Sequence, residues 1–124
     1  YNVRFCSLPE LLSESDIITL HLPLTPKSQN LLTPDKISLM KDGAILINTS
    51  RPGLIDAQAL SAALKEGHLG GVGLDDLPER GIHLFSDFEN VILSPHIAGL
   101  TNESIRRMDT ELANRIISHI ERAS

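Results

Sequence analysis

The stretch "GAILINTSRPGLIDAQALSAALKEGHLGGVGLDD" (residues 43–76) decides the fold class, because two short apolar runs flank an Ala-rich segment. The runs, residues 43–49 and 70–75, have the length of β-strands. Asp56 is placed to cap a helix formed by the segment between them, and Gly67 is placed to end it. A strand, a helix and a second strand in this order predict a right-handed crossover between parallel strands.

Two more apolar runs, residues 16–22 and 90–94, repeat the pattern along the chain. All four runs are almost continuously apolar, which is typical of parallel strands covered on both faces of a sheet. Helix signals fall outside the runs: Ser7 opens a capping-box pattern, and Thr33 before Pro34 pairs an N-cap with a proline at the first helical position. The sequence therefore predicts an α/β fold with a parallel sheet and flanking helices.

The end of the chain predicts one long amphipathic helix. Thr101 or Asn102 is its expected cap, and apolar residues then recur every three or four positions. These residues are Ile105, Met108, Leu112, Ile116 and Ile120. We expect this stripe to pack in the core, with part of it able to face a partner subunit. Residues 77–89 are predicted to form an irregular connection.

Composition and charge narrow the class of protein. With 124 residues, 41% of them hydrophobic and 22% charged, the chain fits one domain over residues 1–124. The net charge is −5 and the basic residues are scattered, which argues against a nucleic-acid partner. No apolar run could span a membrane, and no His, Asp or Glu pair has metal-ligand spacing, so we expect neither a membrane nor a metal partner. Cys6 stands alone, which fits the reducing cytoplasm.

Polar and charged residues directly follow the carboxyl ends of the predicted strands. In open parallel sheets, ligands bind at these ends. Ser50 and Arg51 follow the second run, Asp75 and Asp76 the third, and His96 the fourth. A guanidinium grips a carboxylate through two parallel hydrogen bonds, and an imidazole transfers protons near neutral pH. Together they suit a 2-oxo or 2-hydroxy acid, with hydride exchanged by a nicotinamide cofactor. Asp76 is interpreted as a solvated neighbour of Asp75.

Three blocks of the sequence carry a resemblance to a known family. They are "LLSESDIITLHLPLTPKSQNLL" (residues 11–32), "LMKDGAILINTSRPGLIDAQALSAALKEGHLGGVGLDD" (residues 39–76) and "VILSPHIAGLT" (residues 91–101). In this order and spacing they resemble the D-isomer-specific 2-hydroxyacid dehydrogenases. The resemblance implies a Rossmann-like, dinucleotide-binding domain of which this chain is the second part, with the first half of that domain and the substrate domain absent. It also leads us to expect a homodimer for the longer protein.

The same resemblance assigns roles to individual residues. It implies that Arg51 binds the substrate carboxylate and that His96 is the general acid and base. The cofactor is NAD or NADP, and the residues implied to line its side of the site are Pro23, Thr25, Thr49, Ser50, Asp75, Ala98 and Gly99.

The first departure from the family pattern is that this sequence contains no glycine-rich phosphate loop. The glycines of "GGVGLD" (residues 70–75) lack the G-x-G-x-x-G spacing, and we expect them to open no helix. The chain by itself is therefore expected to hold a pyrophosphate poorly and to be inactive when isolated.

Two further departures concern the predicted catalytic residues. The family places a catalytic Glu five residues after the Asp, where this chain has Arg80. Glu79, one position earlier, is our candidate for the carboxylate beside His96, and the alternative is that Arg80 occupies that place. Pro52 replaces the usual Gly after Arg51 and should push Arg51 towards an extended conformation. The unusual connection "PERG" (residues 78–81) and the short loop between Asp75 and His96 keep open an alternative function, a nucleotide-sensing interaction module without turnover.

Overall fold

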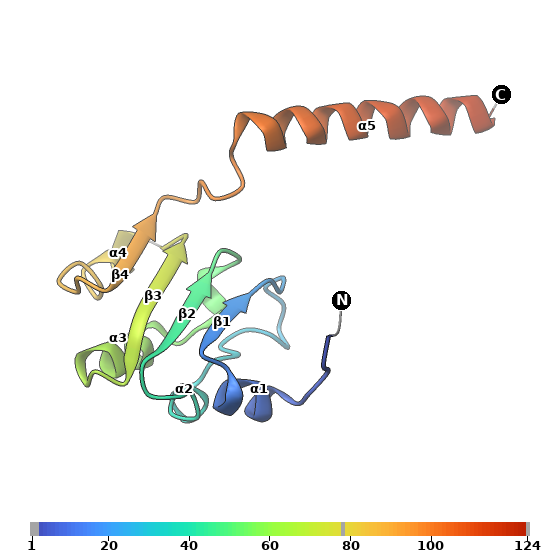
Figure 1. Ribbon diagram of the computed structural model, residues 1–124. Helices are drawn as coiled ribbons and strands as arrows, with labels where there is room; N and C mark the ends of the chain where they lie inside the picture. Colours follow the sequence, from blue (N-terminus) through green and yellow to red (C-terminus); the bar gives the residue numbers. More distant parts are fainter. Residues whose placement is uncertain (1–2, 78, 124) are drawn as a thin grey trace.

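The fold is built on a parallel sheet of four strands in the order β1-β2-β3-β4 (Figure 1). The computed structural model describes residues 3–77 and 79–123. The strands are β1 (Ile17–Leu20), β2 (Ala44–Asn48), β3 (Leu69–Asp75) and β4 (Val91–Ser94). The helices are α1 (Leu8–Glu14), α2 (Pro34–Ile37), α3 (Ala57–Lys65), α4 (Glu79–Ile82) and α5 (Asn102–Ala123), with a 3-10 helix at Pro52–Leu54. The predicted α/β class and the four predicted strands are confirmed.

Helices α1, α3 and α5 begin where a side chain accepts a hydrogen bond from one of their first backbone N–H groups, whereas Thr33 before α2 makes no such side-chain bond. The side chains of Ser7 and Asp56 accept such hydrogen bonds at the starts of α1 and α3. At the start of α5, Thr101 Oγ1 accepts from the N–H of Ser104 at 3.0 Å. Thr101 is therefore the cap, and Asn102 is the first residue of the helix.

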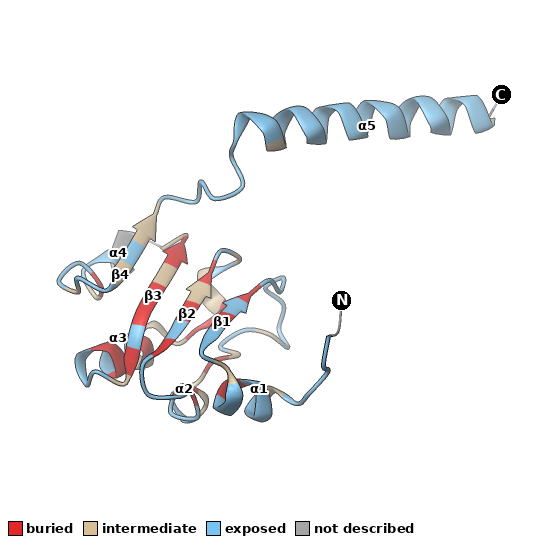
Figure 2. Cartoon of the chain, viewed as in Figure 1, coloured by how far each residue is buried: buried red, intermediate tan, exposed pale blue. Residues whose placement is uncertain are grey.

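The hydrophobic core lies between one face of the sheet and the helices beside it (Figure 2). Leu12 of α1, Leu46 of β2 and Leu60 of α3 are each at most 1% exposed, and burying such a side chain contributes roughly 1.5–3 kcal/mol. Side chains of the opposite face stay exposed, among them Ile17 at 61% and Ile92 at 75%. The prediction that both faces are covered is therefore wrong for the described residues, because their helices pack on one face.

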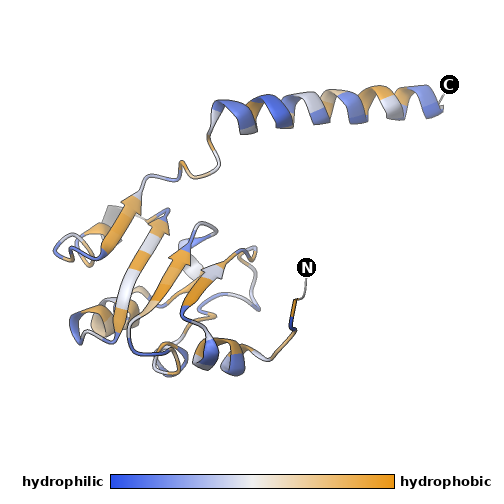
Figure 3. Ribbon diagram, in the orientation of Figure 1, coloured by the Kyte–Doolittle hydropathy of each residue, from blue (hydrophilic) through white to orange (hydrophobic). Residues whose placement is uncertain are grey.

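Helix α5 extends away from the sheet instead of packing on it (Figures 1 and 2). Its apolar stripe, visible as orange segments in Figure 3, is exposed, with Met108 at 57% and Leu112 at 60%. The predicted core packing of this stripe is wrong. Within the described residues no helix combines the length and the apolar composition needed to cross a membrane.

The connection between β3 and β4 is more ordered than the sequence predicts. It contains the short helix α4, and Phe85 beyond it is only 1% exposed. Ser61 of α3 also donates a hydrogen bond to the carbonyl of Leu84 at 2.9 Å. The glycines of residues 70–75 lie within β3 and open no helix, as predicted.

Gly70 allows β3 to approach the start of β2. A Cβ built on Gly70 would lie 2.3 Å from the carbonyl oxygen of Gly43, a distance that only backbone movement could relieve. We predict that Gly70→Ala lowers the free energy of unfolding by about 1–3 kcal/mol, measured by urea denaturation. Gly73→Ala is the matched control on the same strand, because its Cβ would meet its nearest neighbour at an ordinary 3.8 Å. Equal losses in both variants would contradict this explanation.

Candidate active site

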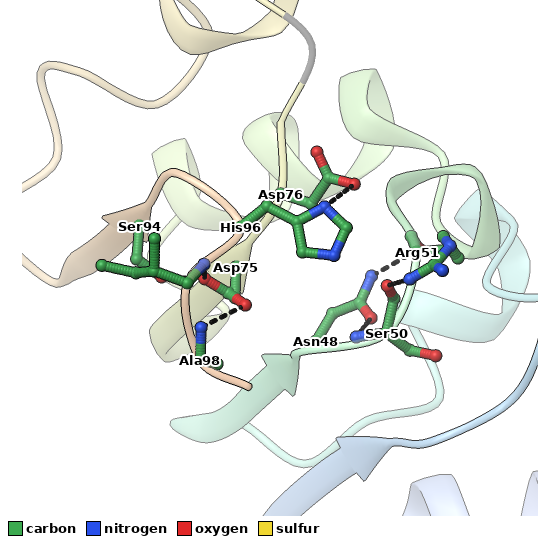
Figure 4. Close-up of polar contacts among 9 residues, drawn as sticks. Asn48, Ser50, Arg51, Asp75, Asp76, Ser94, His96 and Ala98 are labelled. Carbon is green, nitrogen blue, oxygen red and sulfur yellow. Dashed lines mark hydrogen bonds and ion pairs between the residues drawn. The ribbon is translucent and has the colours of Figure 1, made fainter. Parts of the chain in front are cut away.

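The carboxyl ends of β2, β3 and β4 form the edge that carries the predicted catalytic residues. Parallel pairing places Asp75, the last residue of β3, beside Ser94, the last residue of β4. Arg51 follows β2 and His96 follows β4, so both emerge at this edge, where Figure 4 shows them with Asn48. The structure thus brings the guanidinium-bearing loop and the imidazole-bearing loop to the same end of the sheet.

A buried carboxylate fixes the loop that carries the histidine. Asp75 is 4% exposed and accepts hydrogen bonds from Ser94 Oγ at 2.5 Å and from the N–H groups of Ile97 and Ala98 at 2.8 Å each. The Ser94 hydroxyl is the main reason that the pKa of Asp75 is lowered; burial opposes the shift, and the two N–H groups and nearby His96 add to it. The ionised carboxylate therefore holds the Ser94 hydroxyl before the turn after β4 and the backbone N–H groups of Ile97 and Ala98 beyond it.

A buried amide fixes the loop that carries the arginine. Asn48 is 4% exposed; its Nδ2 donates to the carbonyl of Arg51 at 2.8 Å, and its Oδ1 accepts from the N–H of Ser50 at 3.0 Å. Ser50 Oγ donates to the carbonyl of Leu22 at 2.6 Å, which ties this loop to the segment after β1. Arg51 has φ −141° and ψ 138°, the extended conformation predicted from Pro52. Its exposed guanidinium donates to the Ser50 carbonyl at 2.8 Å.

His96 pairs with a residue that the sequence interpretation set aside. Its Nδ1 lies 3.2 Å from Asp76 Oδ2, and the two side chains are 55% and 30% exposed. Asp76 is therefore a contact of the imidazole, which corrects its interpretation as a solvated neighbour of Asp75. Glu79 and Arg80 begin α4, but their side chains lie outside the part of the chain that the structure describes. The predicted place of Glu79 beside His96 remains a prediction.

A cleft of about 500 Å³ lies on the open face of the sheet. Its lining includes three of the residues that we predict to face the cofactor. They are Thr49, Asp75 and Ala98, and glycines of β3 contribute to the same lining. The remaining four, which do not line this cleft, lie in loops that follow the strands: Pro23, Thr25, Ser50 and Gly99. No group of three or more His, Cys, Asp or Glu residues among those described could hold a metal ion.

Sequence reasoning missed Asn48, Ser94 and Asp76. For Asn48 and Ser94 a signal exists: each is a polar residue that ends an apolar run predicted to be a buried strand, and such a residue must find hydrogen-bond partners. Asp76 gives no comparable signal, because an aspartate after a strand is usually solvated.

The hydrogen bonds of Asp75 predict a pH-dependent contribution to stability. Asp75→Asn replaces an accepting oxygen with an NH₂ group that would face another donor, so we expect a lower free energy of unfolding at neutral pH. Because the pKa of Asp75 is lowered in the folded state, its contribution is present above the ordinary carboxyl pKa. It is lost as the pH falls below about 4 through the lowered value.

Denaturant unfolding between about pH 7 and pH 3 measures this contribution. The difference between the native chain and the Asp75→Asn variant should shrink in acid. Asp35→Asn, at an exposed position of α2, is the control. A difference that is the same at every pH would contradict the role assigned to the ionised carboxylate.

Comparison with known proteins places this geometry in a family. The family model described as the D-isomer specific 2-hydroxyacid dehydrogenase NAD binding domain matches residues 1–98. The chain is 39% identical to D-3-phosphoglycerate dehydrogenase of Haemophilus influenzae, covering 95% of this chain and 30% of that protein. It is 42% identical to glyoxylate reductase of Thermofilum pendens, covering 92% of this chain and 34% of that protein. The chain thus spans about a third of the length of these curated relatives.

Solved structures give the same result. The structure of D-2-hydroxyisocaproate dehydrogenase matches with a TM-score of 0.86 and 32% identity, covering 96% of this chain and 41% of that one. D-lactate dehydrogenase from Aquifex aeolicus, determined with NAD and lactic acid, matches with a TM-score of 0.78 and 34% identity, covering 94% and 40%. The chain belongs to the D-isomer-specific 2-hydroxyacid dehydrogenase family, as part of its NAD-binding domain.

Proposed function

We propose that the protein carrying this chain is an oxidoreductase that interconverts a 2-oxo acid and a 2-hydroxy acid with a nicotinamide cofactor. One observation carries the proposal. Arg51 and His96 emerge from loops at the same edge of the sheet, and each loop is fixed by a buried polar side chain. The family membership supports the same reaction class. No feature of the described residues favours the alternative, a nucleotide-sensing module without turnover.

In reduction, Arg51 binds the substrate and His96 transfers the proton. The guanidinium of Arg51 holds the carboxylate through paired hydrogen bonds and so orients the adjacent carbonyl. His96 gives a proton from Nε2 to the carbonyl oxygen, because its Nδ1 faces Asp76. The nicotinamide, when bound, supplies the hydride that reaches the carbonyl carbon. In oxidation His96 takes the proton back from the hydroxyl at the same nitrogen.

The residues around the cleft fit the nicotinamide end of such a cofactor. Ile45, Ile47 and the glycines of β3 give it an apolar lining. Polar residues stand at its two ends: Thr49, Asp75 and Ser94 where the strands end, and Glu89 and Asn90 where β4 begins. An apolar pocket with a few placed polar groups suits a flat ring that carries an amide. NAD and NADP share this end. One relative was solved with NAD and another with NADPH. The family model is that of an NAD binding domain, so we propose NAD as the first candidate and NADP as the second.

The remaining elements of the proposal concern the protein's setting. Small 2-oxo or 2-hydroxy acids are the proposed partners, because the relatives include phosphoglycerate, glyoxylate and glycerate enzymes. The exposed apolar stripe of α5 is compatible with a homodimer. The exposed free thiol of Cys6 suits the cytoplasm.

Replacing His96 should remove the proton transfer but not the cofactor site. We predict that His96→Gln in the full-length protein lowers turnover of glyoxylate or hydroxypyruvate with NADH or NADPH by about 10²–10⁴-fold. Cofactor affinity, measured by fluorescence titration, should stay nearly unchanged. His119→Gln on the exposed helix α5 is the control. Turnover near the native rate in His96→Gln would refute the assignment.

Replacing Arg51 should weaken recognition of the carboxylate. Arg51→Lys keeps the positive charge but loses the planar fork, so we predict that kcat/KM for the 2-oxo acid falls roughly 10- to 100-fold. Arg115→Lys, at an exposed position of α5, should leave kcat/KM unchanged. An unchanged KM and kcat in Arg51→Lys would show that another group binds the carboxylate.

A further inference from the structure

We propose that Asp76 is the positioning residue of His96: its carboxylate holds the ring by Nδ1 and keeps Nε2 available for proton transfer. The proposal rests on the proposed function for its catalytic meaning. Its structural basis is the 3.2 Å separation between His96 Nδ1 and Asp76 Oδ2 at the edge where the strands end (Figure 4).

The backbone at both residues is strained. Asp76 has φ +145° and His96 has φ +57°, and among the described non-glycine residues the only other positive φ is that of Asn30. Such conformations are unfavourable for L-residues and persist only where the surrounding structure imposes them. Two of these rare conformations therefore occur at the two partners of one ion pair.

The hydrogen bonds of Asp75 hold together the two segments on which the partners lie. Asp75 immediately precedes Asp76, and its own side chain binds Ser94, Ile97 and Ala98 on the two sides of His96. The turn is closed further by the N–H of His96, which donates to the Ser94 carbonyl at 3.0 Å. One buried carboxylate thus fixes where β3 ends and how the histidine loop folds over it.

The chemistry of the contact determines which nitrogen can react. The contact is an ion pair when His96 is protonated. The negative charge of an ionised carboxylate beside Nδ1 attracts a proton to that nitrogen, so Asp76 favours the tautomer of neutral His96 that carries its proton on Nδ1. Nε2 is then the free acceptor in the oxidation direction, and it is the nitrogen that gives up its proton in reduction. Because both side chains are partly exposed, the pair is expected to add little to stability. Its effect is on the orientation and tautomer of the ring.

Nuclear magnetic resonance of the full-length protein with ¹⁵N-labelled histidine tests the pairing directly. In the native chain we expect the neutral His96 ring to be mainly the Nδ1–H tautomer. In Asp76→Asn a larger fraction of the neutral ring should be the Nε2–H tautomer. Asp76→Glu should keep more of the Nδ1–H tautomer than Asp76→Asn does. The matched control is Asp42→Asn, which removes the other Asp–His contact, 2.8 Å between Asp42 and His68 Nδ1. It should alter the signals of His68 and leave those of His96 unchanged.

Two results of this measurement would overturn the proposal. One is a His96 tautomer that does not respond to Asp76→Asn. The other is a tautomer that responds to Glu79→Gln instead, which would make Glu79 the partner. Either result is obtained without turnover.

Turnover of the full-length protein tests the consequence for catalysis. Asp76→Asn should lower kcat about 10²-fold, at the low end for a positioned acid–base group. The KM for the nicotinamide cofactor should be unchanged, and Asp76→Glu should recover part of the rate. Asp42→Asn should retain full activity. A native protein with no turnover of any 2-oxo acid would refute the proposed function, and the tautomer measurement would still decide the pairing.

Discussion

The geometry of this site depends on the burial of one ionised carboxylate at the end of β3. Asp75 is removed from water, so its charge must be satisfied by the protein. It finds the hydroxyl of Ser94 on the neighbouring strand and two N–H groups of the loop beyond. These hydrogen bonds hold the exposed turn that carries His96 in one conformation. A charged side chain can fix the conformation of a short turn because its hydrogen bonds are directional. Apolar packing is not directional and cannot do so.

Asn48 does the same at the end of β2 with a neutral group. Asn48 and Asp75 are the two polar residues that are buried among those described, and both sit where a strand passes into a functional loop. The amide both donates and accepts, so it can bind a carbonyl and an N–H of one turn. The carboxylate of Asp75 only accepts hydrogen bonds, so its partners are N–H and O–H donors. Each residue type matches the backbone groups that its loop presents.

Sequence patterns predict the strands, the helix caps and the edge at which the site lies, because these follow from local periodicity and from parallel topology. The placement of Arg51 and His96 at one end of the sheet is of this kind. What local patterns miss is the environment of each element. An apolar stripe on α5 and apolar residues on both faces of the sheet indicate that something covers them, yet in this chain Leu112 and Ile92 are exposed. Periodicity identifies an apolar face but not its partner.

The partner of His96 shows the same limit at the scale of single side chains. Counting positions along the family pattern directs attention to Glu79 and Arg80, since spacing in sequence is taken as spacing in the fold. The structure shows Asp76 in contact with the imidazole, with a backbone φ of +145° that no composition rule predicts. The place of Glu79 beside His96 stays a prediction. A carboxylate next to Asp75 can reach the ring because Asp75 itself folds the histidine loop back over the end of β3. The contact thus joins two segments that the hydrogen bonds of the buried carboxylate hold together.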